Sequence, residues 1–258
     1  MHYWQNLGAT VLLVSVAAGA QAADKTWTLQ GDSLKIATSC AKTVEIRPGA
    51  AHQVTVAASA EHGEEIDQLT VNGGDVATIQ LANSHCWDKG LFSRGPSLAL
   101  TITVPMGAPL DIKDAGVASY TIGSLGGDLK LALAGAGNAE IGDVAAAHIQ
   151  AAGAGNVSIR GVKGAFDAQM AGAGNLTVGA IDAPSAGIQA RGKSAIRLGS
   201  GSIGSFSLNS AGASDVAVDA TVGDADVNVA GAGEVRLAKL TGHINQSVSG
   251  AARVSVGH

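Results

Sequence analysis

The chain has 258 residues, of which 36 are glycine and only 3% are aromatic, and its formal net charge is −5. This length suits one elongated domain, or one domain with a small cap. An acidic chain in which only 14% of the residues are charged lacks the basic face that nucleic acids require, so we expect no nucleic-acid partner.

Residues 1–22 are expected to form a secretory signal peptide. The apolar run from Leu7 to Ala18 is too short to span a membrane, and the small residues at 20–22 are typical of a cleavage site. This segment contains His2 but no Lys or Arg, which is unusual for a signal peptide. We therefore predict an exported protein, periplasmic or secreted to the cell surface, with no membrane span in the mature chain.

Residues 23–112 are predicted to form strands that make up the first coils and a cap. The alternating runs at 43–46, 53–56 and 98–104 are typical of β-strands, and the polar stretches 62–65 and 83–96 are predicted loops. A cap at this end would cover strand edges that otherwise promote association.

Both cysteines, Cys40 and Cys86, precede the repeats described below. In an oxidising compartment one disulfide is the expected state, and closing a loop of this length would stabilise the fold by about 4 kcal/mol. Two free buried thiols, or a metal site that includes His85, are the alternatives. Because one adjacent histidine gives no metal-ligand spacing pattern, we expect no metal and no other cofactor.

Residues 113–258 contain a repeat of about 19 residues, in which Ala-Gly-Ala-Gly-Asn is followed by alternating aliphatic residues. One glycine recurs at intervals of 18 to 20 residues, at Gly116, Gly135, Gly153, Gly172, Gly192, Gly212, Gly231 and Gly250. A fixed period of this size marks a solenoid. Three short apolar segments in each period predict an all-β fold: an elongated, three-faced parallel β-helix with an irregular N-terminal β cap, continuous with residues 23–112 as one domain. The default hand is right-handed.

The repeat glycine is predicted to be a corner residue with a positive φ, because glycine adopts that conformation without steric cost. Three residues after it stand Asn138, Asn156 and Asn175, and Asp215 occupies the same place in a later coil. These side chains predict an asparagine ladder across successive coils. The alternative is a calcium site of the β-roll type, which needs a nine-residue period with a regular aspartate.

A polar outer face is predicted on the strand that leads to each repeat glycine. Three residues before the glycine lies an amide row: Gln150, Gln169, Gln189, Asn209 and Asn228. Five residues before it lies a second polar row that includes His148, Asp167 and Asp226. Such a face suits a polymer such as a glycan, with contacts repeating every 4.8 Å or so. The alternative is a solvated face whose amides keep the sheet in register.

One order of features along the chain is characteristic. A strand-rich opening leads to Thr101-Ile102-Thr103-Val104-Pro105, then to Ala115-Gly116-Val117-Ala118-Ser119 and the repeats. Over residues 40–258 this order resembles the head GIN domain family of bacteria, which is linked to autotransporter adhesin heads. The resemblance implies an exported parallel β-helix of the cell envelope with an adhesin-like role. The turn of that family is closer to Gly-Ser-Gly-Asp than to the Ala-Gly-Ala-Gly-Asn of this chain.

A catalytic site requires a cluster of titratable groups. The carboxylates of the repeats do not gather in this way, because they do not recur in one column. We therefore predict a non-catalytic envelope protein, not an enzyme, whose β-helical surface binds a polymer or a protein. One alternative is a glycan-active enzyme that uses N-terminal residues, namely Glu61, Glu64, Glu65, His85 or Asp88. Another is a structural module that assembles end to end through the C-terminal coil, where residues 253–256 lack an evident cap.

Overall fold

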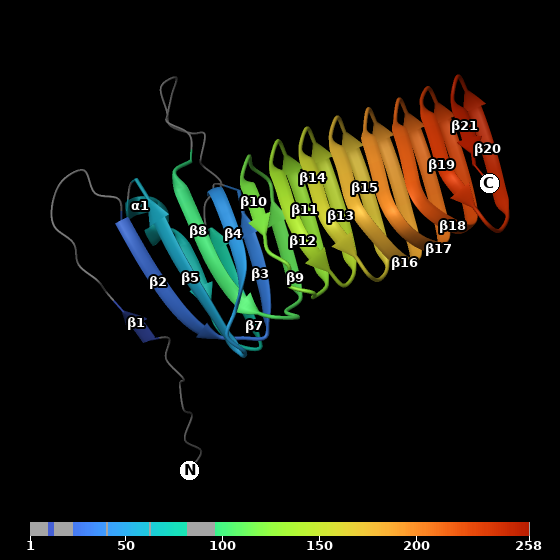
Figure 1. Ribbon diagram of the computed structural model, residues 1–258. Coiled ribbons are helices and arrows are strands. Elements are labelled where there is room, and N and C mark those ends of the chain that lie inside the picture. Colours follow the sequence, from blue (N-terminus) through green and yellow to red (C-terminus); the bar gives the residue numbers. More distant parts are fainter. Residues whose placement is uncertain (1–9, 13–22, 40, 62, 82–95, 258) are drawn as a thin grey trace, which may run out of the picture.

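The computed structural model describes residues 10–12, 23–39, 41–61, 63–81 and 96–257. This part of the chain forms one elongated rod of stacked β-strands (Figure 1). Apart from residues 10–12, the predicted signal peptide lies outside the described residues, as do Cys40 and Cys86. The disulfide therefore stays a prediction.

The N-terminal part of the rod is built from eight strands and one short helix. These are β1 (Thr10–Leu12), β2 (Ala23–Gln30), β3 (Ser33–Thr38), β4 (Ala41–Gly49), β5 (Gln53–Ala60), α1 (Gly63–Asp67), β6 (Leu69–Asn72), β7 (Val76–Leu81) and β8 (Leu98–Pro105). The three strands predicted from alternating runs are β4, β5 and β8. The predicted loop at 62–65 is wrong in part, because the chain forms α1 there and buries Ile66. No helix in the described ranges is long and apolar enough to cross a membrane.

This N-terminal part covers one end of the rod, as predicted for a cap. Strand β5 pairs antiparallel with both β2 and β8. Strands β3 and β4 instead pair in parallel with β9 and β10, the first strands of the repeat region. The cap and the coils therefore share one continuous hydrogen-bonded network (Figure 1).

The repeat region contains the strands β9 (Leu110–Asp114), β10 (Ser119–Ile122), β11 (Leu129–Gly135), β12 (Asn138–Val144), β13 (Ala147–Gly153), β14 (Asn156–Val162), β15 (Phe166–Gly172), β16 (Asn175–Gly192), β17 (Ala195–Gly212), β18 (Asp215–Gly231), β19 (Glu234–Leu240), β20 (Ile244–Gly250) and β21 (Arg253–Val256). They form two parallel layers. Sheet A is made of the strands that lead to each repeat glycine: β9, β11, β13, β15, the second halves of β16 to β18, and β20. Sheet B is made of the strands that begin three residues after that glycine. Neighbouring coils are in register, as in the pairing of Ile149 with Ala168.

The fold class is confirmed, and the third apolar segment of each period also pairs between neighbouring coils, as Ile181 does with Gly201 and Ala183 with Ile203. The third apolar segment of each period, represented by Val144 and Val162, lies at the end of the sheet B strands β12 and β14. The segment is short, and it continues the strand before it without a break. From β16 to β18 a single strand continues from sheet B into sheet A.

The repeat glycines lie at the tight turn between the two sheets. The last six of the eight have φ between 93° and 140°, as predicted, whereas Gly116 and Gly135 are not among the residues with positive φ. The carbonyl oxygen of Gly153 accepts a hydrogen bond of 2.8 Å from the Ala173 N–H of the next coil. A Cβ at Gly172 would collide with that same oxygen. Glycine is therefore required both by the backbone conformation and by the close approach of successive turns.

The core lies between the two sheets and is made of the aliphatic columns seen in the sequence. Ile149, Val178 and Leu208 have no measurable exposure. A further column, six residues before the repeat glycine, is also buried and alternates large with small side chains: Leu129, Ala147, Phe166, Ala186, Phe206 and Ala225. Each phenylalanine has an alanine on the coils at both sides, so the bulky rings do not compete for one space.

Candidate functional site

The five residues of the predicted amide row lie on the outer surface of sheet A. Their register is continuous, since Gln169 pairs with Gln150 and Gln189, and Asn209 pairs with Gln189 and Asn228. In the described part of the chain these amides form no hydrogen bonds with one another. Gln150 Nε2 lies 2.9 Å from His148 Nε2, and Asn228 donates to Asp226 at 3.0 Å. The row therefore presents amide groups to solvent.

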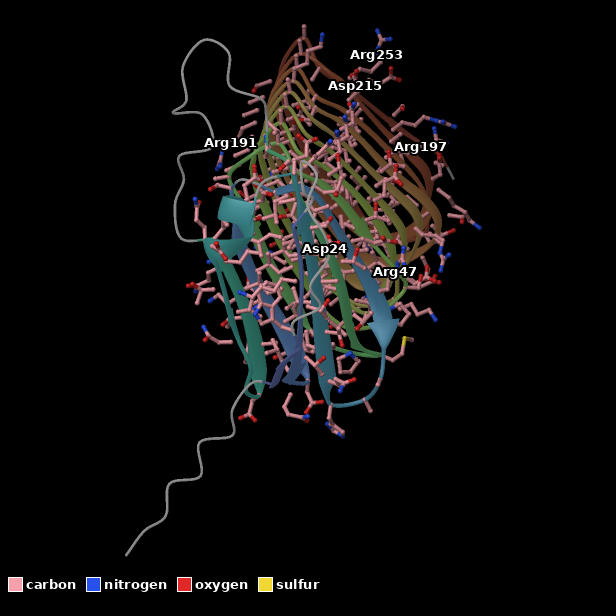
Figure 2. All side chains as sticks on the ribbon, turned by 90° about the vertical axis from the view of Figure 1, so that its left-hand side faces the viewer. Asp24, Arg47, Arg191, Arg197, Asp215 and Arg253 are labelled. Carbon is pink, nitrogen blue, oxygen red and sulfur yellow. The ribbon has the colours of Figure 1, made fainter. Side chains whose placement is uncertain are left out.

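The outer surfaces of sheet A and sheet B point in opposite directions, so they are separate. Figure 2, which views the rod from its capped end, shows Arg191 of sheet A and Arg197 of sheet B on opposite sides. A site on one surface therefore shares no side chains with the other surface.

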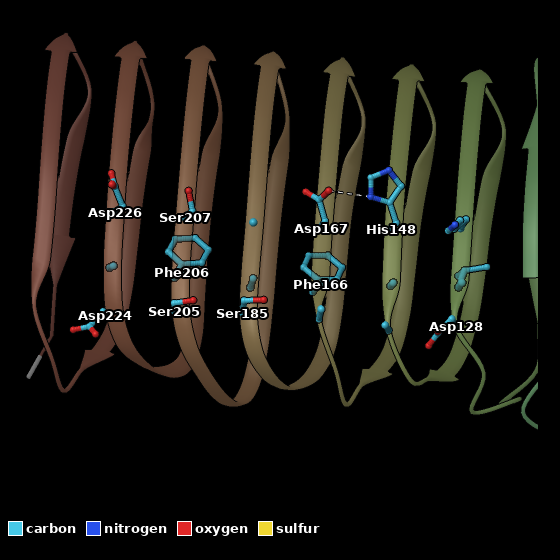
Figure 3. Close-up of a pocket in the computed structure, with 18 of the residues that line it drawn as sticks. Asp128, His148, Phe166, Asp167, Ser185, Ser205, Phe206, Ser207, Asp224 and Asp226 are labelled. Carbon is cyan, nitrogen blue, oxygen red and sulfur yellow. Dashed lines mark ion pairs between the residues drawn. The ribbon is translucent and has the colours of Figure 1, made fainter. Parts of the chain in front are cut away.

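A groove runs along the outer surface of sheet A beside the amide row, and we call it the sheet A groove (Figure 3). It has a volume of about 810 Å³ and crosses β11, β13, β15, β16, β17, β18 and β20. Its two sides are the rows seven and five residues before each repeat glycine. The first row comprises Asp128, Ala146, Ala165, Ser185, Ser205, Asp224 and His243, and the second comprises Lys130, His148, Asp167, Gly187, Ser207, Asp226 and Asn245. At about 4.8 Å per coil, the seven strands span about 29 Å.

The floor of the groove is the strand backbone over the buried column of alternating large and small residues. Phe166 and Phe206 point into the core and are only 2% exposed. The groove therefore lies over a well-packed core, and no exposed Phe, Tyr or Trp ring lines it.

The charged groups of the groove are concentrated toward its two ends, where several of them have partners. His148 Nδ1 lies 2.9 Å from Asp167 Oδ2 (Figure 3). At the other end Asp224 accepts a 2.8 Å hydrogen bond from the His243 backbone N–H, and its carboxylate lies 3.6 Å from the imidazole. These carboxylates are engaged with neighbouring coils.

The middle of the groove is uncharged. It is formed on β16 and β17 by Ser185, Gly187, Ser205 and Ser207. Among the described residues, the three serine hydroxyls have no hydrogen-bond partner, and neither do the nearby amides of the amide row on these strands. This segment therefore holds free donors and acceptors at each coil.

A second, smaller groove of about 290 Å³ lies on the other side of the amide row. Gln189, Asn209 and Asn228 line it together with Arg191. The amide row thus lies between two grooves on one surface.

Sequence reasoning predicted the amide row and the row of His148, Asp167 and Asp226, and the structure places both on this surface. It missed the row seven residues before the glycine, which includes Ser185 and Ser205. The signal was present, because the alternation that points the rows three and five residues before the glycine outward also points this row outward.

The outer surface of sheet B confirms the asparagine ladder. Asn156 donates to Asn138 Oδ1 at 3.0 Å, and Asn175 donates to Asn156 Oδ1 at 2.8 Å. Farther along, Asp215 accepts from the Glu234 N–H at 3.0 Å. The described residues contain no group of three or more His, Cys, Asp or Glu side chains placed to hold a metal ion.

Sheet B also carries ion pairs at its edge. Arg160 Nε donates to Asp143 Oδ1 at 3.0 Å, and its Nη2 contacts both Asp143 Oδ2 and Ser124 Oγ. The hydrogen bond from the Arg160 guanidinium lowers the pKa of Asp143 below its ordinary value. A second carboxylate, Asp219, lies 2.6 Å from Arg197. These charges of sheet B are therefore partnered between neighbouring coils.

A buried polar cluster joins the cap to the first coil, and sequence reasoning missed it. Tyr120 donates to Asp114 Oδ2 at 2.7 Å, and Thr38 Oγ1 lies 3.1 Å from the Tyr120 hydroxyl. Asp114 also accepts from the Gly116 N–H at 2.5 Å. Burial, followed by the negative charge of Asp114, raises the pKa of Tyr120 well above its ordinary value. Because all three side chains are buried and bonded, the cluster is structural.

The N-terminal residues considered for catalysis do not form a site in the described part. The Glu65 carboxylate accepts hydrogen bonds from the Ser97 N–H and hydroxyl, at 3.2 and 2.9 Å. Glu61 is exposed and bonds to Ser97 through its backbone N–H. The Glu64 side chain, His85 and Asp88 lie outside the described residues.

Comparison with solved structures shows the same fold in three bacterial proteins, each described as a putative adhesin. The one from Parabacteroides distasonis has a TM-score of 0.62 at 14% identity, covering 91% of this chain and 96% of its own. The one from Bacteroides fragilis has a TM-score of 0.57 at 14% identity, covering 93% and 97%. The one from Parabacteroides merdae has a TM-score of 0.56 at 12% identity, covering 92% and 97%.

No curated protein matches the chain. The family model described as Toastrack DUF4097 matches residues 32–257. This range includes nearly the whole described rod, from β3 to β21. The resemblance to the head GIN domain family stays a prediction. The chain belongs to the Toastrack DUF4097 family.

Proposed function

We propose that the protein is an exported, non-catalytic component of the cell envelope that binds an extended polymer along the sheet A groove, in an adhesin-like role. The observation that carries this proposal is the length of the groove, which crosses seven strands with one set of outward side chains per coil. A linear polymer can repeat the same contact at each coil, whereas a compact ligand would use only a few coils.

The rigidity of the groove supports the same function. Its strands from β11 to β18 are paired on both sides within the parallel stack, so the outward side chains keep a fixed spacing. A preformed surface loses little entropy when it binds an extended ligand. The description of three structural relatives as putative adhesins agrees with this role.

The test is binding of the purified protein to intact bacterial cells and to purified envelope polysaccharides, with release of reducing ends assayed in parallel. The variant Ser207→Trp fills the middle of the groove with a bulky ring, and Ser158→Trp places the same ring on the outer surface of sheet B. We expect the first variant to lose binding and the second to retain it, with no sugar release. Equal binding by both variants would exclude the groove, and release of reducing ends would show an enzyme.

Export is part of the proposal and has its own test. After expression with the full sequence in a bacterium, we expect the protein in the periplasm or medium with Ala23 at its N-terminus. Mass spectrometry of the purified chain measures this directly. A cytoplasmic protein that keeps residues 1–22 would contradict it.

A second candidate role is self-association through the coil of β20 and β21. Each of these strands pairs on one side only within the described residues, and Val248 on β20 is 43% exposed. Unpaired strand edges with exposed apolar residues favour pairing with another chain. Light scattering at high concentration should detect a dimer that Val248→Lys dissociates, whereas a monomer at all concentrations would exclude this role.

A further inference from the structure

The sheet A groove has a charge distribution that selects among polymers. Its rows carry four carboxylates, on Asp128, Asp167, Asp224 and Asp226, and one lysine, Lys130. A polymer rich in phosphate or carboxylate groups would meet like charges at both ends of the groove. The groove therefore disfavours anionic polymers.

Acyl chains and extended peptides also fit poorly. The exposed large hydrophobic side chains of the described residues are Val76, Met106, Val117 and Val248, and none lines the groove. An acyl chain would therefore find only small apolar side chains to cover, such as those of Ala146 and Ala165. A peptide that binds by strand addition needs a free strand edge, and the strands at the middle of the groove are paired on both sides.

The groups that remain free are neutral and can both donate and accept hydrogen bonds. Ser185, Ser205 and Ser207 present hydroxyls in the middle of the groove, and Gln189 and Asn209 present amides beside them. They recur from coil to coil in register, and none is bonded to another described residue. Three of the four carboxylates, by contrast, have partners: Asp167 pairs with His148, Asp224 with His243 and Asp226 with Asn228.

We propose that the ligand of the sheet A groove is an uncharged, linear polysaccharide that lies along the rod. This inference rests on the proposed function and names its ligand class. Sugar hydroxyls bond to the free serine and amide groups of β16 and β17, and the short side chains leave room for the rings. Because the bonds are made to neutral groups, binding does not depend on counterion release.

The test is calorimetric titration of the purified protein with three probe classes: neutral linear polysaccharides (β-glucan, mannan and galactan), anionic polygalacturonate and cationic chitosan. We expect binding to a neutral polymer that is unchanged by added salt. With oligosaccharides of that polymer, affinity should rise with chain length and level off once the chain spans the groove, at about 29 Å.

Two variants check the location of the ligand. Ser207→Trp should weaken binding at least about tenfold, and Asn209→Ala should weaken it about fivefold, which corresponds to one lost hydrogen bond of about 1 kcal/mol. The alanine variant removes only an exposed amide, so it tests the site without a risk to folding. Ser158→Trp on sheet B is the matched control and should bind as the unmodified protein does.

Three results would overturn the inference. The first is that the protein binds only polygalacturonate or chitosan. The second is that Asn209→Ala and Ser207→Trp leave the affinity for a neutral polymer unchanged. The third is that the protein binds no neutral polymer. If cells are still bound and Ser207→Trp abolishes that binding, the proposed function stands while the ligand class is wrong. If Ser207→Trp leaves cell binding intact, the proposed function fails as well.

Discussion

Replacing one repeat glycine by alanine should destabilise the rod far more than the loss of a hydrogen atom suggests. We choose Gly172, which has φ of 133° at the turn after β15. An alanine in this conformation costs about 2 kcal/mol. Its Cβ would also collide with the Gly153 carbonyl oxygen, which now accepts the 2.8 Å hydrogen bond from Ala173. Weakening that bond costs about 1 kcal/mol more, so we expect a loss of about 3 kcal/mol in the free energy of unfolding.

A second glycine on a neighbouring strand provides the control. Gly187 on β16 does not have a positive φ, and a Cβ there would meet only Asp167 Oδ1, at 3.4 Å. Gly187→Ala should therefore leave the stability unchanged or raise it by up to about 1 kcal/mol.

Urea unfolding followed by far-ultraviolet circular dichroism measures both variants, and hydrogen exchange at the Ala173 amide locates the effect. We expect a lower urea midpoint and faster exchange for Gly172→Ala only. If Gly172→Ala were no less stable than Gly187→Ala, the steric account of the repeat glycine would be refuted.

Three further predictions concern the polar side chains of the coils. Tyr120→Phe removes the buried hydrogen bond to Asp114 and should cost about 2 kcal/mol. Burial raises the pKa of Tyr120 in the folded protein, so this tyrosine ionises at a lower pH in the unfolded chain. The free energy of unfolding of the unmodified protein should therefore fall above about pH 10. Urea unfolding between about pH 8 and about pH 11 should show that this decline is absent in Tyr120→Phe. An equal decline in both proteins would contradict the assignment of the decline to Tyr120. Arg160→Gln should return the pKa of Asp143 to its ordinary range in an NMR titration, because the guanidinium now lowers it; an unchanged pKa would exclude this cause. In the unmodified protein, this ion pair stabilises the fold at pH values above the pKa of Asp143 in the unfolded chain. The stabilisation is lost as the pH falls through the pKa of Asp143 in the folded protein, which is the lower of the two. Its size is small because both side chains are exposed. Asn156→Ala breaks the ladder on both sides and should lower the free energy of unfolding by about 1 kcal/mol, and an unchanged urea midpoint would show that the ladder adds no stability.

The repeat by itself predicted most of what is periodic in this protein. In a parallel stack in register, residues one period apart become neighbours in space, so a column in the sequence becomes a row on the rod. For this reason the inward columns around Ile149 and Leu208, the turn glycines and the ladder of Asn138, Asn156 and Asn175 followed from spacing alone.

Two other features were decided by the tertiary structure. The way in which each coil passes from sheet B into sheet A, as one continuous strand in β16 and β17, depends on how the sheets pack. The cluster of Asp114, Tyr120 and Thr38 joins residues up to 82 positions apart, and the cap places them together. A period reports only which residues are neighbours along the stack, whereas the path of the chain between the sheets and a contact between unrelated segments are fixed only when the whole chain is packed.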